Sequence, residues 1–172
     1  MVETVYWAGC FLSYRFPKLK EATIKLLGRV GVKHEVMGVE ECCGLPIYLL
    51  GLKEKAKVIA AKNAEKLANV EQLVTSCAGC FKMFSKIYPE ELGVNLKPKV
   101  KHVSQLLLEN SNKLSFKELK KKVTYHDPCD LVNAGVTEEP RKLLEMIPGL
   151  NFIELDLNRD SSTCCGGGGG LY

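Results

Sequence analysis

The sequence is poor in the features that mark membrane and secreted proteins. No apolar stretch approaches the roughly 18 residues that a membrane-spanning helix requires, so no direct membrane span is predicted. Residues 1–4 contain an acidic Glu3 and lead straight into a strand-like run, unlike the basic and then apolar pattern of a signal peptide. We therefore expect a cytoplasmic protein, in which thiols stay reduced and clustered cysteines indicate metal or redox chemistry rather than disulfides.

A strong charge of one sign is also lacking. The 172 residues carry a net charge of +4, and the densest basic run, residues 117–122, has no RNA-stacking motif or helix-turn-helix signature beside it. Such a run is typical of a solvated linker or helix face, so we predict no nucleic-acid partner. Hydrophobic content of 46% and charged content of 26% are ordinary for a globular protein with one good core or two small ones.

Cysteine, by contrast, is abundant, and its eight residues fall into two similar sets. The first set has an isolated cysteine, an adjacent pair followed by glycine, and a C-x-x-C motif: Cys10, Cys42, Cys43, Cys77 and Cys80. The second set repeats the isolated cysteine and the Cys-Cys-Gly sequence without a C-x-x-C motif: Cys129, Cys164 and Cys165. Five thiolates suit an iron–sulfur cluster, whose usual cubane form needs four, whereas the second set amounts to half a site.

Segments of strand and helix character alternate along the chain. Strands are expected in six short apolar or β-branched runs: residues 4–9, 34–39, 72–76, 100–103, 122–126 and 151–156. Helices are expected in six further segments: residues 17–30, 52–67, 78–88, 104–109, 115–121 and 139–147, with the third ending near Pro89.

This alternation predicts an α/β protein made of two repeated parallel β-α-β units, of which the second is truncated. We expect that the second unit either docks on the first or is mobile. Because sites in parallel sheets lie at the carboxyl ends of the strands, the five thiols of the first set should share one edge of one sheet.

Glycine follows each cysteine pair. Gly44 allows the backbone to approach closely beside two adjacent side chains, and Gly166 takes the same place after the second pair, so both are candidates for contact with a bound cofactor. The glycine run at residues 166–170 lacks the Lys-Ser/Thr of a phosphate-binding loop. A flexible end or a loop that wraps a cluster is the expected interpretation.

Structural zinc is the alternative for the first set, although the usual zinc pattern has two C-x-x-C hooks and this chain has one. In the second set, His126 is either a fourth zinc ligand or a hydrogen-bonded residue at the end of a strand. Asp127 and Pro128 are expected to cap and begin a helix. A further hypothesis makes Cys77 and Cys80 a thiol redox pair, which requires a lowered thiol pKa at a helix N-terminus.

The whole arrangement resembles the cysteine-rich CCG domain of heterodisulfide reductase subunits B and D. Related domains occur in the iron–sulfur subunits of glycolate oxidase, lactate-utilisation and anaerobic glycerol-3-phosphate dehydrogenase complexes. The resemblance is carried by the first cysteine set and by a second series of motifs: Tyr125-His-Asp-Pro-Cys129, Pro140-Arg141, Pro148-Gly149 and Cys164-Cys-Gly-Gly-Gly-Gly. It implies a first CCG domain at residues 1–112, a basic linker at 113–121, and a second CCG domain at 122–172 that is truncated before its C-x-x-C motif.

The resemblance also implies a cofactor and a role. The five cysteines of the first set would bind a noncubane [4Fe-4S] cluster, and the three of the second set would supply part of another site. The chain would be an electron-transfer subunit, or a fragment of one, passing electrons toward a disulfide substrate or from oxidation of a 2-hydroxy acid.

Two departures from the family pattern qualify that role. Asp130 stands where many relatives have histidine. The chain has no ferredoxin-type C-x2-C-x2-C-x3-C-P run, so electrons must arrive from another redox subunit, ferredoxin-like or flavoprotein. We expect an oxidoreductase subunit rather than an enzyme active alone, and no catalytic residue is assigned. The alternative is a zinc-stabilised interaction module without enzymatic activity.

Overall fold

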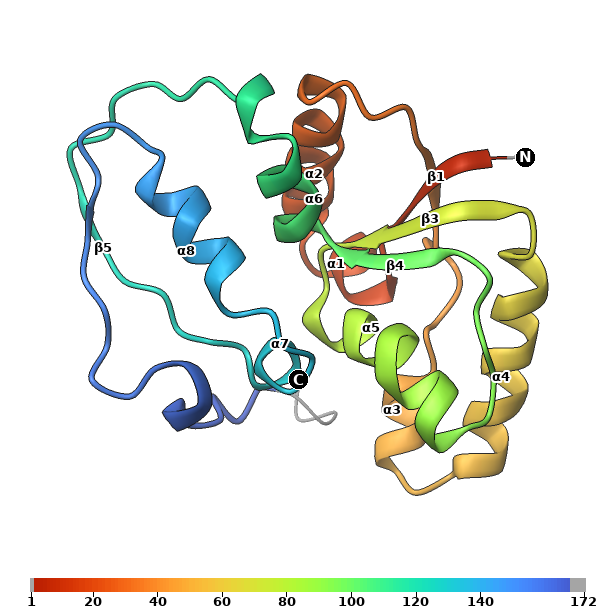
Figure 1. Ribbon diagram of the computed structural model, residues 1–172. Helices are drawn as coiled ribbons and strands as arrows, with labels where there is room; N and C mark the ends of the chain where they lie inside the picture. Colours follow the sequence, from red (N-terminus) through yellow and green to blue (C-terminus); the bar gives the residue numbers. More distant parts are fainter. Residues whose placement is uncertain (1, 168–172) are drawn as a thin grey trace.

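The computed structural model describes residues 2–167 and contains two parallel sheets (Figure 1). The larger sheet has the order β2-β1-β3-β4 and consists of β1 (Val2–Trp7), β2 (Glu35–Met37), β3 (Val70–Thr75) and β4 (Lys99–His102). The smaller sheet pairs β5 (Lys122–Val123) with β6 (Asn151–Phe152). The predicted α/β class with parallel β-α-β units is confirmed.

Helices connect the strands. Those of the first half are α1 (Cys10–Tyr14), α2 (Pro17–Arg29), α3 (Leu45–Leu49), α4 (Lys53–Lys66), α5 (Ala78–Lys82), the π-helix η1 (Met83–Glu91), α6 (Val103–Glu109) and the 3-10 helix η2 (Ser111–Lys113). Those of the second half are α7 (Cys129–Val132), α8 (Glu138–Glu145) and the 3-10 helix η3 (Arg159–Ser161).

Strand β1 is buried on both of its faces, as expected for the centre of a parallel sheet. Val5 and Trp7 pack against α4 and η1, whereas Tyr6 and Ala8 pack against α2 and α6. All four residues are fully buried. Each large side chain buried in this way contributes about 1.5–3 kcal/mol, so the sheet and its two helical layers form the main core of the protein.

The chain leaves β1 and β3 toward opposite faces of the sheet. After β1 it continues into α2, on the side of Tyr6, and after β3 it continues into α5 and η1, on the side of Trp7 (Figure 1). Where the connections after two neighbouring parallel strands leave toward opposite faces of the sheet, a crevice opens at the carboxyl ends of the strands. This position between β1 and β3 is therefore where a binding site is expected.

The second half docks on the first, one of the two outcomes expected from the sequence. Helix α8 packs beside α6, and α7 packs beside α5 (Figure 1). A small apolar cluster of Phe81, Leu131 and Val136 lies at the second of these contacts. No helix among residues 2–167 is long and apolar enough to cross a membrane.

Four expected elements differ from the structure. Residues 115–121 form no helix, because this segment runs beside residues 148–151 and the Leu119 N–H donates to the Pro148 carbonyl (2.8 Å). Strands β5 and β6 contain two residues each instead of five or six. The helix after Cys77 also does not end near Pro89 but continues to Glu91, because its second part is a π-helix, whose wider turn moves the preceding carbonyl away from the proline ring.

Candidate functional site

The first cysteine set lies at the carboxyl ends of three neighbouring strands. Cys10 begins α1 shortly after β1, and Cys42 and Cys43 end the loop between β2 and α3. Cys77 joins β3 directly to α5, which contains Cys80. All eight cysteines of the chain are free thiols, and Cys43 and Cys80 are buried, with 4% and 3% of their surface exposed.

Four of these thiols shift the pKa values of one another. The pKa of Cys43 is lowered by hydrogen bonding first with Cys42 and then with Cys80, and the pKa of Cys77 is lowered by hydrogen bonding with Cys80. The pKa values of Cys42 and Cys80 are raised, in each case chiefly by hydrogen bonding with Cys43. The hypothesis of a C-x-x-C redox pair requires a lowered thiol pKa, and Cys77 has one. However, the pKa values of Cys42 and Cys43 are shifted as well, so Cys77 and Cys80 do not act as an isolated pair.

Two glycines let the backbone approach these sulfur atoms. Gly9 has a φ of +76°, and a Cβ at this position would lie 3.2 Å from the Sγ of Cys80. Gly44 has a φ of +89°, and its N–H donates to the Sγ of Cys42 (3.3 Å). A side chain at either position would be strained, so both glycines keep the loops close to the thiols.

Asn63 and Tyr88 hold the Cys42-Cys43 segment from the opposite side. The Asn63 Nδ2 donates to the Cys42 carbonyl and to the Tyr88 hydroxyl, both at 2.9 Å, and that hydroxyl donates to the Cys43 carbonyl (2.9 Å). Burial is the main cause that raises the pKa of Tyr88, so it remains a neutral donor. Sequence reasoning missed both roles, although an asparagine within the apolar stripe of α4 was a visible signal.

A buried donor beside the thiols lacks a partner. The indole Nε1 of Trp7 is fully buried and has no hydrogen-bond acceptor among residues 2–167. A Cβ placed on Gly9 would lie 3.8 Å from this nitrogen and 3.2 Å from the Cys80 Sγ, so the indole N–H is close to that sulfur. Buried donors are normally satisfied, so an acceptor bound beside these thiols would complete the hydrogen bonding of this N–H.

The second cysteine set repeats the local geometry of the first. Gly166 has a φ of +72°, and its N–H donates to the Sγ of Cys164 (3.4 Å), as the N–H of Gly44 does to Cys42. Cys129 begins α7, and its pKa is raised by burial, then by the charge of Asp130, then by hydrogen bonding with Cys164. Residues 168–170 of the glycine run lie outside the described residues.

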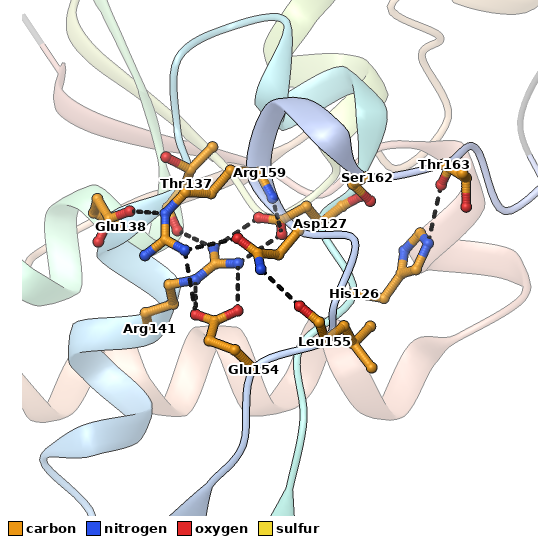
Figure 2. A network of polar contacts seen from close by, with 11 residues as sticks. His126, Asp127, Thr137, Glu138, Arg141, Glu154, Leu155, Arg159, Ser162 and Thr163 are labelled. Carbon is orange, nitrogen blue, oxygen red and sulfur yellow. Dashed lines mark hydrogen bonds and ion pairs between the residues drawn. The ribbon is translucent and has the colours of Figure 1, made fainter.

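A buried ion network underlies this second set (Figure 2). Arg141, only 2% exposed, binds Asp127 through both terminal nitrogens (2.7 and 2.6 Å) and Glu154 through Nε and Nη2 (2.5 and 3.1 Å). Asp127 therefore does not cap α7 as the sequence predicted, because its carboxylate is occupied by this guanidinium; the N-cap residue is Pro128. The sequence marked Arg141 only as part of the family resemblance and gave it no role, since one arginine among lysines and glutamates is an ordinary surface composition.

His126 is hydrogen-bonded through Nε2 to the carbonyl of Thr163 (3.1 Å), as one of its two sequence-based interpretations predicted. The strand that it was expected to end stops at Val123. His102 ends β4, and its Nδ1 accepts a hydrogen bond from the Ser104 N–H (3.3 Å) at the start of α6.

Cys80 of the first set and Cys129 of the second lie on neighbouring helices, α5 and α7. Lys82, at the end of α5, forms an ion pair with Asp130 of α7 (3.0 Å). A Cβ at Gly79 would lie 2.5 Å from the Leu45 side chain, so the glycine in the C-x-x-C motif leaves room for Leu45. Asp130, the residue that departs from the family pattern, thus joins the two halves of the chain.

The first set suits a group ligated at several atoms. Within residues 2–167, no three His, Cys, Asp or Glu side chains converge so as to hold a metal ion. The first-set thiols instead follow three neighbouring strands along one edge of the sheet, with close backbone at Gly9 and Gly44 and an unpaired Trp7 N–H nearby. Soft thiolate donors in such a setting fit an iron–sulfur cluster, whose sulfur atoms also accept hydrogen bonds.

Comparison with known proteins identifies similar sequences. The family model "Cysteine-rich domain" (CCG) matches residues 4–85 and 123–172. One of the subunits of dihydromethanophenazine:CoB–CoM heterodisulfide reductase of Methanosarcina barkeri is 35% identical over 98% of this chain and 44% of its own length. An uncharacterized iron-sulfur protein of Methanocaldococcus jannaschii is 32% identical over 99% of this chain and 33% of its own length.

A bacterial relative extends the range. One of the subunits of anaerobic glycerol-3-phosphate dehydrogenase of Escherichia coli K12 is 31% identical over 95% of this chain and 43% of its own length. The chain thus spans less than half the length of each of these relatives.

Proposed function

The chain belongs to the cysteine-rich CCG domain family, and from this membership we propose that it is an iron–sulfur subunit, or part of one, of a heterodisulfide reductase-like oxidoreductase. The observation that carries the proposal is the placement of five cysteines after β1, β2 and β3, at the carboxyl ends of these strands, where Cys43 and Cys80 are buried and glycine backbone lies close to the sulfur atoms. Its electrons are exchanged with other redox subunits, ferredoxin-like or flavoprotein. They pass toward a disulfide or from a 2-hydroxy acid.

We assign the ligands of a [4Fe-4S] cluster, of the noncubane kind, to the five cysteines of the first set: Cys10, Cys42, Cys43, Cys77 and Cys80. Such a cluster supplies one-electron transfer. Around it, Asn63 and Tyr88 fix the Cys42-Cys43 backbone, and the unpaired Trp7 N–H is available to a sulfur acceptor. Gly44 keeps the backbone close to its two cysteine neighbours, and the surrounding core excludes water.

The domain division and the second set complete the proposal. Residues 1–112 and 122–172 form two CCG units joined by a basic linker at 113–121. Cys129, Cys164 and Cys165, with Gly166 beside them, supply part of a second metal site. The alternative, a zinc-stabilised module, loses support because a relative over 99% of the chain is named an iron-sulfur protein.

The test is the metal and acid-labile sulfide content of protein purified without oxygen, together with its electron paramagnetic resonance spectrum. We expect about four irons with matching sulfide, as one cluster provides. Replacing the buried Cys43 with alanine should abolish most of this iron, because the cluster would lose a central ligand. The matched control is Cys165→Ala, which removes an exposed cysteine of the second set and should keep the first-set signal.

Two results would count against the assignment. One is full iron and an unchanged spectrum in Cys43→Ala. The other is zinc without sulfide in the native chain, which would favour the interaction module instead.

A further inference from the structure

The buried arginine of the second half uses its whole hydrogen-bonding capacity. A guanidinium has five N–H donors. Those of Arg141 are distributed over Asp127, Glu154 and one further acceptor, the Thr137 carbonyl (2.6 Å) (Figure 2). These three acceptors come from the segment after β5, the segment after β6 and the start of α8. One side chain therefore fixes three separate pieces of backbone.

The same network brings the two cysteine-bearing segments side by side. Asp127, whose side chain is 1% exposed, also accepts the backbone N–H of Arg159 at 2.8 Å. Its carbonyl accepts the Ser162 hydroxyl (3.3 Å), and the neighbouring His126 reaches the Thr163 carbonyl (3.1 Å). Residues 126–127 are thus paired with 162–163, immediately before Cys129 and Cys164.

Arg159 shows that this alignment is maintained against a local cost. Its φ is +51°, in the left-handed region, and it is the one residue other than glycine with positive φ among those described. Such a conformation costs roughly 1–2 kcal/mol for a residue with a side chain. In this conformation, the Arg159 N–H reaches Asp127 and its guanidinium binds Glu138 (2.5 Å).

We propose that Arg141 is a positioning residue that holds Cys129 and Cys164 together as a preorganised dithiol, ready for a thiophilic ligand, without any bound group. The two thiols lie 35 positions apart in sequence, and hydrogen bonds of His126 with Thr163 and of Asp127 with Ser162 bring the segments that carry them side by side. The inference goes beyond the cluster assignment of the first set. It adds that the second set is shaped by ion pairs of the chain itself rather than by a metal.

The test measures how strongly the two thiols are held together. The full chain, treated with chelator, is equilibrated anaerobically in glutathione buffers, and the Cys129–Cys164 disulfide is quantified by peptide mass spectrometry. Each disulfide formed consumes one oxidised glutathione and releases two reduced glutathiones, as the two protein thiols lose two electrons and two protons. The equilibrium gives the effective concentration of one thiol at the other.

We expect Arg141→Met and Arg141→Lys each to lower this effective concentration about tenfold or more, toward the millimolar level of a flexible loop. Lysine should not rescue, because its three donors cannot serve two carboxylates and a carbonyl in one plane. Val136→Ala is the matched control. It opens a cavity at a fully buried residue of the same half, and the Val136 side chain makes none of the hydrogen bonds of Arg141. It should keep the native value.

Three results would overturn the proposal. The first is a native effective concentration in Arg141→Met, and the second is rescue by lysine. The third is an equal fall in Val136→Ala, which would reduce the role of Arg141 to general stability. None of these measurements depends on iron at the first set, so a failure here is distinguishable from a failure of the proposed function.

Discussion

In the first half of the molecule, Cys43 and Cys80 lie within an apolar core, whereas in the second half Cys129, Cys164 and Cys165 are exposed. Both halves nevertheless form the same turn, in which a glycine with positive φ donates its N–H to the first cysteine of the pair. The first turn is fixed by Asn63 and Tyr88 within the core, and the second lies beside segments held by Arg141.

The difference teaches that one local motif can rest on two kinds of support. Apolar burial involves no titration of its own, so the first half depends on pH only through the few polar groups buried with it, such as His102. Ion pairs depend on the protonation of carboxylates and on ionic strength where they are exposed. The two halves should therefore respond differently to cavities, to acid and to charge replacement.

The largest expected effect is a cavity in the first half. Leu73 of β3 is fully buried, and replacing it with alanine should lower the free energy of unfolding by about 2–5 kcal/mol. Trp7 is the single tryptophan of the chain, so its fluorescence during urea unfolding reports this half. As a control, Leu157→Ala removes an exposed side chain and should change stability by less than about 0.5 kcal/mol. A small change in Leu73→Ala would show that the sheet is not the main source of stability.

Acid should separate the two halves into different pH ranges. Burial lowers the pKa of His102 to about 4, so the unfolded chain binds a proton that the folded chain does not as the pH falls from about 6.5. The first half should therefore lose stability between about pH 6.5 and 4. The hydrogen bond from Arg141 is the first cause that lowers the pKa of Asp127, and its stabilisation is present above the unfolded value near 3.9. That stabilisation should be lost only as the pH falls below about 3.9.

The measurement combines urea unfolding followed by Trp7 fluorescence with hydrogen exchange of residues 122–167 at each pH. His102→Gln should flatten the pH dependence of the first half, and Asp127→Asn should remove the acid step of the second. If both halves lost protection in the same pH range in the native chain, the contrast between apolar and ionic support would be wrong.

The smallest expected effect concerns the contact between the halves. The Lys82–Asp130 ion pair is about one-quarter exposed on each side chain, so its coupling energy should be about 0.5–1 kcal/mol. A double-mutant cycle with Lys82→Met and Asp130→Asn, read from the stability of both halves, measures this coupling. Lys120 and Glu118, a more exposed pair at 3.4 Å, provide the matched cycle and should give a value near zero. Equal coupling in the two cycles would mean that Asp130 does not join the halves.

The sequence predicted the parts of the molecule that depend on local pattern. The alternation of strand and helix predicted the correct fold class. The cysteines were expected at one edge of the sheet because the carboxyl ends of parallel strands all lie at the same edge. The ligand set and the domain division remain predictions. The role of Arg141 was not predictable, because its partners lie 13 and 14 residues away in separate segments.

The errors have a common physical cause. Residues 115–121 have helix-forming composition, but their backbone is engaged by residues 148–151. Likewise, β5 and β6 are shorter than their composition suggests. Beyond Val123 and Phe152, the two segments are held by the ion pairs of Asp127 and Glu154 with Arg141 and not by further strand pairing. In both cases a tertiary contact overrides local propensity.

The position of β1 has a consequence for how the chain matures. This strand is synthesised before the other three strands of its sheet, yet it lies inside the sheet and pairs with β2 and with β3. Ribosomal synthesis proceeds from the N-terminus, so the sheet cannot close until Val70–Thr75 has emerged. Cys10, Cys42 and Cys43 therefore spend part of translation as unprotected thiols. If these cysteines bind the proposed cluster with Cys77 and Cys80, iron can be loaded only after Cys80 has left the ribosome.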